Sequence, residues 1–333
     1  MKKILNLPAD YVDETLDGLC LAHGDSFRRL GEDGRVLALA DGPVTGKVGI
    51  VTGGGSGHLP VFLGYIGRGL LDACAVGNVF AGPRVADCQA AAQAADGGAG
   101  ILHLYGNYGG DRMNFEMAQE LLELEGIEVD AVRVADDVAS ASSAERDKRR
   151  GVAGLVYAYK IAGARAAAGG SLAEVAAAAR KAAQAVRSIG VALTPCIVPE
   201  SGKASFAIAE DEVEFGMGIH GEPGIWRGKL PTADMLAQEM LDQLLPELEL
   251  QRGSRVAVLV NSLGATPLEE LYILYRRVVQ VLTDHGATPV MPLVGRYATS
   301  MEMAGASLTL MPLDSELEGL LKAPADCPFW RVI

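Results

Sequence analysis

Short apolar runs alternate with stretches of helical periodicity along the first half of the chain. Runs of about six residues rich in Val, Ile and Leu are typical of buried strands. The segment 86–95 is Ala-rich, and 114–125 carries apolar residues at the three- and four-residue spacing of a helix. A further helix is expected over 60–69. This alternation predicts a layered α/β domain. The predicted strands of this half are 47–52, 73–79, 100–105 and 128–134.

The second half continues with two Ala-rich helices, expected over 151–168 and 172–188. Ser171 with Glu174 three residues later matches the capping box that starts a helix. We therefore predict two layered α/β domains with mixed sheets covered by helices, an N-terminal one over 1–186 and a C-terminal one over 187–333. The remaining predicted elements are strands 190–198, 203–208, 213–217, 255–261, 288–294 and 307–312, and helices 232–245 and 268–285.

Between these halves, residues 139–150 are polar and rich in charge of both signs. A segment of this kind is typical of a solvated surface loop, and we prefer that interpretation to a binding patch.

Composition narrows the classes of function. The chain has 333 residues, 49% of them hydrophobic and only 5% aromatic, so small aliphatic side chains must fill its cores. A net charge of −13 argues against binding to nucleic-acid phosphates. No apolar run is long enough for a signal peptide or a membrane span, which favours a cytoplasmic protein. The five cysteines are scattered without a C-x-x-C pair, and they predict neither disulfides nor a metal site.

Three Gly-rich segments each bring a polar group to the end of a predicted strand: His58, Asp111 and His220. Glycine lets the backbone turn tightly and lets a ligand approach closely. Asp111 opens a predicted helix, so it is either a helix cap or a general base for a hydroxyl, with neither interpretation favoured. We prefer a functional role for His220, because Glu222 can orient its ring and an unprotonated imidazole can add to a ketone carbonyl.

Known nucleotide motifs are absent from the sequence. The segment 53–58 lacks the lysine of a Walker loop, and His58 stands where a dinucleotide-binding loop needs its last glycine. No kinase Gly-rich loop with its companion lysine occurs either. We therefore predict no ATP site and no cofactor in this chain. His103 lies in an apolar strand and is interpreted as a core histidine with a satisfied hydrogen bond.

Taken together, the polar segments resemble one known family, that of dihydroxyacetone kinase, in its substrate-binding K subunit. The resemblance runs from Met1 to about Trp330. The segments that carry it are Gly53-Gly54-Gly55-Ser56-Gly57-His58, Asn107-Tyr108-Gly109-Gly110-Asp111, Met113-Asn114-Phe115-Glu116, Gly218-Ile219-His220-Gly221-Glu222-Pro223-Gly224 and Asn261-Ser262-Leu263-Gly264-Ala265-Thr266.

The resemblance implies a role for each polar residue. His220 binds C2 of the ketose covalently, Asp111 acts as general base on the terminal hydroxyl, and His58 hydrogen-bonds the reacting end. Such a subunit usually forms a homodimer and works with a separate L subunit, which holds ATP, or ADP, with Mg²⁺. Backbone and small residues line the pocket in this interpretation, namely Gly55, Ser56, Gly57 and Gly106.

Two positions depart from the family pattern. Leu59 stands where a glutamate is common, and Gly106 replaces a substrate-contacting lysine. One hypothesis is that the pocket accepts a ketose larger than dihydroxyacetone, such as erythrulose or apulose; an equal alternative is an unchanged triose substrate. A different class, a ketose-sensing coregulator without catalysis, is also known in the family. Retention of His58, Asp111 and His220 favours the kinase subunit.

Overall fold

The first part of the chain forms a six-stranded mixed sheet in the order β1-β2-β4-β3-β5-β6. A computed structural model describes residues 2–333. The strands β3, β4, β5 and β6 run parallel, whereas β1 and β2 add antiparallel strands at one edge. The bounds are β1 Phe27–Leu30, β2 Val36–Leu39, β3 Gly49–Ser56, β4 Ala73–Val79, β5 Ile101–Gly106 and β6 Val129–Val134.

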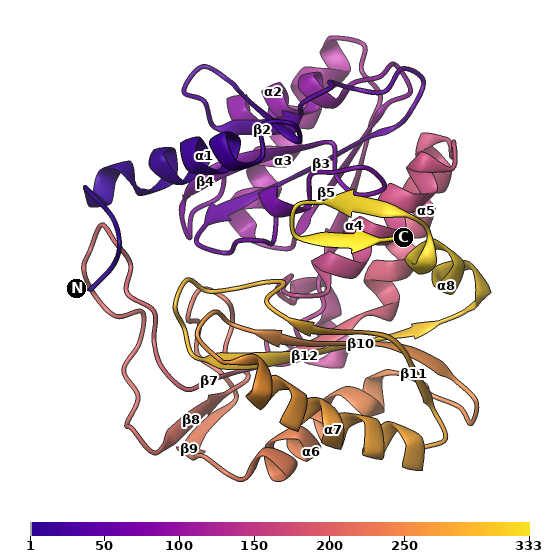
Figure 1. The fold of residues 1–333 in the computed structure, drawn as a ribbon. Helices are drawn as coiled ribbons and strands as arrows, with labels where there is room; N and C mark the ends of the chain where they lie inside the picture. The colour runs from indigo at the N-terminus through magenta and orange to yellow at the C-terminus, as the bar shows by residue number, and fades with distance from the viewer. Residues whose placement is uncertain (1) are drawn as a thin grey trace.

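Helices cover this first sheet, which occupies the upper half of the molecule in Figure 1. The Ala-rich face of α2 packs over one set of strands through small side chains such as Ala91, and α3 packs beside it through Phe115, Ala118 and Leu122. The helix α5 packs on β6, and α4 packs on α5. The bounds are α1 Tyr11–Ala22, α2 Val85–Ala95, α3 Gly109–Leu124, α4 Leu155–Ala167 and α5 Leu172–Ala185.

A second six-stranded mixed sheet follows in the order β11-β10-β12-β7-β8-β9, in the lower half of Figure 1. Only the β10–β11 pair is parallel. The helices α6 and α7 lie against it over a core of aliphatic side chains. The bounds are β7 Arg187–Ala192, β8 Glu212–Phe215, β9 Trp226–Lys229, α6 Ala233–Leu244, β10 Arg255–Ser262, α7 Leu268–Asp284, β11 Thr288–Gly295 and β12 Gly305–Leu313.

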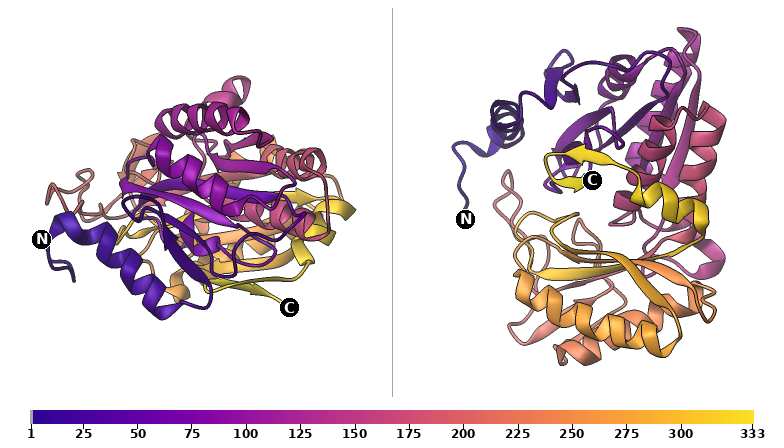
Figure 2. Two further views of the ribbon diagram at one scale, coloured as in Figure 1. Left: turned by 90° about the horizontal axis from the view of Figure 1, so that it is seen from above. Right: turned by 45° about the vertical axis from the view of Figure 1, so that its right-hand side comes forward.

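The end of the chain returns to the first sheet's side. The helix α8 (Ser315–Lys322) packs on α4, and the hairpin of β13 (Ala325–Cys327) and β14 (Trp330–Val332) lies near the upper half in Figure 1 and in the right-hand view of Figure 2. The backbone of Asp326 forms an isolated β-bridge with the backbone of Arg68. The ring of Trp330 packs edge-on against Tyr65, with ring centroids 6.3 Å apart. The sheets themselves change between α5 and β7, and on this basis we propose a division into units 1–186 and 187–333.

The predicted α/β class with two layered sheets is confirmed, and most predicted elements agree with the structure. The capping box is also present, with Ser171 Oγ accepting from Glu174 N. Three expectations were wrong. Residues 60–69 form only the 3₁₀ turn Leu63–Tyr65, the predicted strand 190–198 ends at Ala192, and 203–208 contributes a single bridge.

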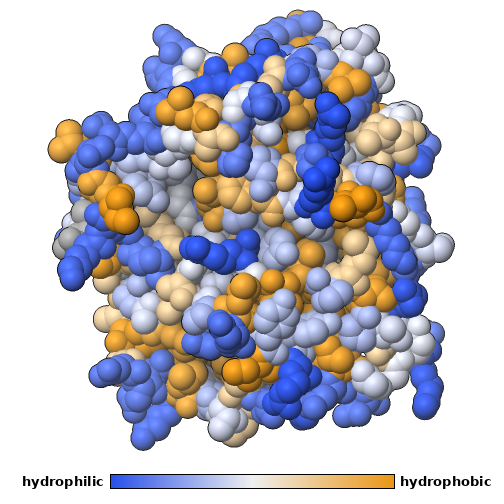
Figure 3. Space-filling model, in the orientation of Figure 1, coloured by the Kyte–Doolittle hydropathy of each residue, from blue (hydrophilic) through white to orange (hydrophobic). Residues whose placement is uncertain are grey.

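The surface carries polar and apolar residues side by side over the face shown in Figure 3. Across residues 2–333, no helix has both the length and the apolar character needed to cross a membrane. In the segment 139–150, by contrast with the expected solvated loop, Arg149 is only 1% exposed and forms a two-pronged ion pair with Glu247.

Candidate functional site

The strand β3 continues through the glycines at its end instead of stopping at residue 52. A side chain at Gly54 would place its Cβ 2.4 Å from the ring of Phe62, and one at Gly53 would lie 2.9 Å from the carbonyl oxygen of Ala75. Glycine therefore lets Phe62 and the neighbouring strand pack directly on the β3 backbone. Gly57 then turns the chain with a φ of +104°, which places His58 beyond the strand end.

His58 is a buried, neutral imidazole with one free nitrogen. Its Nδ1 lies 2.7 Å from the carbonyl oxygen of Thr299, and since a carbonyl only accepts, Nδ1 carries the hydrogen. Burial lowers the pKa of His58 to about 3; the charge of His220 adds to this, and the Thr299 carbonyl opposes it. Within residues 2–333, Nε2 has no hydrogen-bond partner. It is therefore a buried acceptor whose lone pair is unsatisfied.

His220 lies in the loop between β8 and β9, where Glu222 fixes its ring. Glu222 accepts from Nδ1 of His220 at 3.0 Å and from the backbone N–H of His220 at 2.9 Å. Burial raises the pKa of Glu222, but the hydrogen bond from His220 and the charges of His220 and Arg150 outweigh it and lower that pKa to about 2. Glu222 is thus ionised and can only accept, so in the neutral form of the His220 ring Nδ1 carries the hydrogen and Nε2 the lone pair.

Aromatic rings hold the two histidines in place. The His58 ring stacks on Phe80 with centroids 4.9 Å apart, and its edge meets His220 at 4.8 Å. Tyr108 packs on His220 at 4.8 Å from a further side. The sequence indicated Tyr108 only as part of a motif and Phe80 not at all; the left-handed backbone of Phe80, with a φ of +56°, carries no sequence signal in a non-glycine residue.

Asp111 stands in the first turn of α3 with its carboxylate buried. The Oδ1 atom has no hydrogen-bond partner among the described residues, and the helix cap position is Tyr108, without a side-chain cap bond. Burial raises the pKa of Asp111 to about 6, while the charge of His220 pulls it down. A carboxylate with this pKa can take up a proton near neutral pH.

Asp111 and His220 line one cavity of about 290 Å³, together with Gly55 and Gly106. Ser56, Gly57 and His58 line a second cavity of about 450 Å³, which also includes Gly55 and Leu59. The Ser56 hydroxyl donates to the carbonyl oxygen of Gly77 at 2.8 Å. His58 therefore borders the second cavity and not the cavity lined by Asp111 and His220, although its ring packs against the His220 ring with centroids 4.8 Å apart.

Residues 2–333 hold no group of three or more His, Cys, Asp or Glu side chains arranged to bind a metal ion. The site offers a histidine nitrogen and a carboxylate beside one cavity, with a second imidazole packed against the histidine. This set suits an α/β protein that binds a small carbonyl compound bearing hydroxyl groups.

The family follows from comparison with known sequences. Residues 17–329 match the Dak1 domain, and the chain therefore belongs to the Dak1 domain family. It is 45% identical to a PTS-dependent dihydroxyacetone kinase subunit of Listeria innocua, the dihydroxyacetone-binding subunit DhaK, over 99% of this chain and 100% of that protein. It is 42% identical to an L-erythrulose kinase of Pectobacterium atrosepticum over 99% of this chain, but it spans only 56% of that longer protein.

Solved structures agree with this assignment. The dihydroxyacetone kinase of C. freundii superposes with a TM-score of 0.91 at 33% identity, covering 99% of this chain and 60% of that one. A dihydroxyacetone kinase operon co-activator, Dha-DhaQ, superposes with a TM-score of 0.88 at 33% identity, covering 95% and 97%. The fold is therefore shared by kinases and by a regulator. Because the fold does not decide between these two functions, the residues of the site must be used to decide.

Proposed function

We propose that this chain is the substrate-binding subunit of a short-chain ketose kinase. It would hold dihydroxyacetone or a similar ketose on His220 while the terminal hydroxyl is phosphorylated. The observation that carries the proposal is the hydrogen bond from Nδ1 of His220 to Glu222. In the neutral ring this bond leaves the lone pair on Nε2, and His220 lines the same cavity as Asp111. The printed functions of the relatives, dihydroxyacetone-binding subunits and erythrulose kinases, support the ketose class.

The covalent step begins with attack of His220 Nε2 on C2 of the ketose. An N–C bond forms, the C=O π bond breaks, and its electron pair moves to the oxygen, which takes up a proton from solvent. The Nδ1 hydrogen passes to or is shared with Glu222, so the hemiaminal carries no uncompensated charge. Glycerol and other polyols lack the carbonyl, so they cannot form this bond.

Phosphoryl transfer would use the two remaining groups. Asp111 takes the proton of the terminal hydroxyl, and its raised pKa of about 6 suits it to this role. Nε2 of His58, free of other partners within residues 2–333, accepts a hydrogen bond at the reacting end. The phosphoryl donor would come from a separate L subunit that holds ATP, or a tightly bound ADP with Mg²⁺, because the sequence of this chain has no nucleotide-binding motif. We further propose that the chain forms a homodimer.

We propose a substrate longer than the triose on the basis of Gly106. This residue borders the Asp111 cavity, whereas the other departure, Leu59, borders the second cavity. A Cβ at Gly106 would meet the Gly151 carbonyl oxygen at 3.3 Å and the Tyr108 ring at 3.4 Å, so a side chain fits with small adjustments. We expect parent protein to prefer erythrulose and Gly106→Lys to prefer dihydroxyacetone; a parent that prefers the triose would refute this part.

The kinase proposal is tested by reconstitution with an L subunit and phosphoryl donor. His220→Ala should abolish the ketose adduct seen by intact mass, and Asp111→Asn should keep the adduct but lose phosphorylation. Retained phosphorylation in Asp111→Asn would exclude Asp111 as the base. If the parent forms the adduct and never transfers phosphate with any donor system, the coregulator class of Dha-DhaQ becomes the better assignment.

A further inference from the structure

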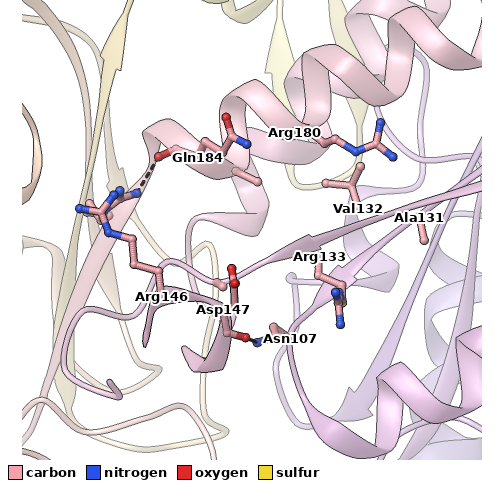
Figure 4. Close-up of a pocket in the computed structure, with 11 residues that line it drawn as sticks. Asn107, Ala131, Val132, Arg133, Arg146, Asp147, Arg180 and Gln184 are labelled. Atoms are coloured by element: carbon pink, nitrogen blue, oxygen red, sulfur yellow. Dashed lines mark hydrogen bonds between the residues drawn. The ribbon is translucent and has the colours of Figure 1, made fainter. Parts of the chain in front are cut away.

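Four arginines surround a cavity that is separate from the ketose site. Its volume is about 350 Å³, and it opens between β6, the C-terminal turn of α5 and the 3₁₀ segment Ser143–Lys148. Figure 4 shows Arg133 and Arg146 approaching from opposite sides, with the carboxylate of Asp147 between them. In a chain of net charge −13 this concentration of positive charge is unusual. The four arginines are Arg133, Arg146, Arg180 and Arg187.

The carboxylates near this cavity do not balance the arginines. Glu247 is shared by three guanidinium groups: it pairs with Arg149 at 2.6 Å, with Arg187 at 3.1 Å and with Arg146 at 3.7 Å. Arg180 pairs with Asp130. With Asp147 included, three carboxylates face five arginines, and within residues 2–333 Arg133 has no ion-pair partner. Two positive charges are therefore uncompensated, close to the charge of a phosphate monoester at neutral pH.

Arg187 gives this cavity a rigid, pre-oriented cation. The residue is only 5% exposed, yet it lines the cavity. Its Nε donates to Glu247, and its Nη1 donates to the carbonyl oxygens of Gln184 and Val186. No hydrogen bond to the described residues uses Nη2. A buried guanidinium held by three acceptors loses little entropy when its remaining donor binds an anion.

A short path of contacts joins this cavity to His220. Asn107, which lines the cavity, donates to the carbonyl oxygens of Asp147 at 2.8 Å and Arg149 at 2.7 Å. The next residue, Arg150, pairs with Asp137 at 2.8 Å and lies 3.7 Å from the Glu222 carboxylate that fixes His220. An anion that binds to the segment Ser143–Lys148 would thus change the position of Arg150, which contacts Glu222, and Glu222 in turn contacts His220.

We propose that this arginine cavity binds a small phosphate monoester carrying hydroxyl groups, and that its occupancy alters ketose binding at His220. The guanidinium groups bind the phosphate oxygens in the two-pronged geometry that arginine favours. The Asp147 carboxylate accepts from the ligand's hydroxyl groups. The binding site stands independently of the ketose kinase assignment, whereas its effect on His220 rests on the proposed function.

The test uses sn-glycerol 3-phosphate as the probe, because it has the phosphate and the hydroxyls but no ketone to react with His220. Calorimetric titration of the full chain at physiological ionic strength should show saturable binding. Arg133→Ala and Arg146→Ala, both exposed, should each weaken binding about tenfold, the loss expected for one charged hydrogen bond. Arg276→Ala removes an equally exposed arginine from α7 and should leave binding unchanged. Asp147→Asn should tighten the binding of inorganic phosphate.

Absence of saturable binding at about 10 mM probe would refute the proposed binding site. An equal loss of probe affinity in Arg276→Ala and Arg146→Ala would show that the probe is held only by non-specific charge attraction, and this would refute the site as well. The coupling is measured as the ketose dissociation constant with and without saturating probe, and we expect a change of threefold or more. Saturable probe binding with an unchanged ketose constant would refute the coupling alone. A chain that binds the probe but no ketose would refute the proposed function and keep the site.

Discussion

The substitution Glu222→Gln tests whether one carboxylate makes His220 a nucleophile. Glu222 accepts two hydrogen bonds from His220, one from Nδ1 at 3.0 Å and one from the backbone N–H at 2.9 Å. Glutamine has the same shape, so the loop should keep its conformation. Its amide group can donate to Nδ1, however, and this moves the ring hydrogen to Nε2, where it blocks attack on the carbonyl. The charge that compensates the developing imidazolium is also lost.

The size of the effect follows from the geometry. A hydrogen bond to a charged group contributes about 1.5–3 kcal/mol, or roughly 10- to 150-fold in an equilibrium constant. The Glu222 side chain is 29% exposed, so solvent screens part of this interaction and the lower end of the range applies. We therefore expect Glu222→Gln to reduce the ketose association constant about tenfold.

The assay is calorimetric titration with ketose, together with intact mass measured on the ketose-saturated protein. Glu214→Gln is the control, since Glu214 is a carboxylate of the same region that accepts from the Gly224 backbone N–H at 2.8 Å and pairs with Arg227 without contacting His220. Adduct yield and affinity equal to the parent in Glu222→Gln would refute the assignment of Glu222 as the group that sets the His220 tautomer.

Three further predictions concern groups whose ionisation or capping the structure defines. Burial lowers the pKa of His103 to about 3, so only the unfolded chain protonates it, and this destabilises the folded state as the pH falls below about 6.5. Between pH 7 and pH 5 the free energy of unfolding measured with urea should therefore fall by about 2 kcal/mol more in the parent than in His103→Leu. At pH 7 the free energy of unfolding of Asp111→Asn, measured with urea, should exceed that of the parent by up to about 3 kcal/mol, because the raised pKa of Asp111 makes its ionised form destabilising as the pH rises from 3.8 to 6. In the parent, the rate of phosphorylation should fall about tenfold per pH unit below pH 6, and a flat pH profile would contradict a base of that pKa. Ser171→Ala should lower the free energy of unfolding by about 1 kcal/mol, since it removes the cap of α5, and an unchanged urea midpoint would show that the cap contributes nothing.

Local patterns in the sequence predicted most of the helices and parallel strands correctly. Apolar periodicity marks α3, α6 and α7, and continuous apolar runs mark β5 and β10, because the side chains themselves make the core. The same rule cannot detect β3 beyond Thr52, where glycines bring no side chain to the pattern. It also missed short strands: β1 and β9 lie at sheet edges and carry mixed residues, whereas β2 is apolar but only four residues long.

Contacts between distant residues account for the features that the sequence could not predict. The hydrogen of His58 is placed on Nδ1 by Thr299, 241 positions away, and Arg149 is buried because its partner Glu247 lies 98 positions along the chain. His103 was correctly expected in the core, but its hydrogen bond was not found: neither ring nitrogen has a partner within residues 2–333. Local composition contains no information on these pairings; the polar segment 139–150 is exposed over 142–148, as expected of a solvated loop, but the burial of Arg149 was not predicted.

The glycines of the site differ in what they are needed for, and this decides how much weight Gly106 can carry. At Gly54 an added Cβ would lie 2.4 Å from the Phe62 ring, and at Gly151 it would lie 2.6 Å from the Gly106 Cα, so packing alone requires glycine there. At Gly106 the nearest atom would lie 3.3 Å away, and the backbone does not adopt a left-handed φ. A Cβ at 106 thus needs only a small shift of its neighbours, so packing requires glycine there less strictly than at 54 or 151, and the proposed link between Gly106 and substrate size depends on this difference.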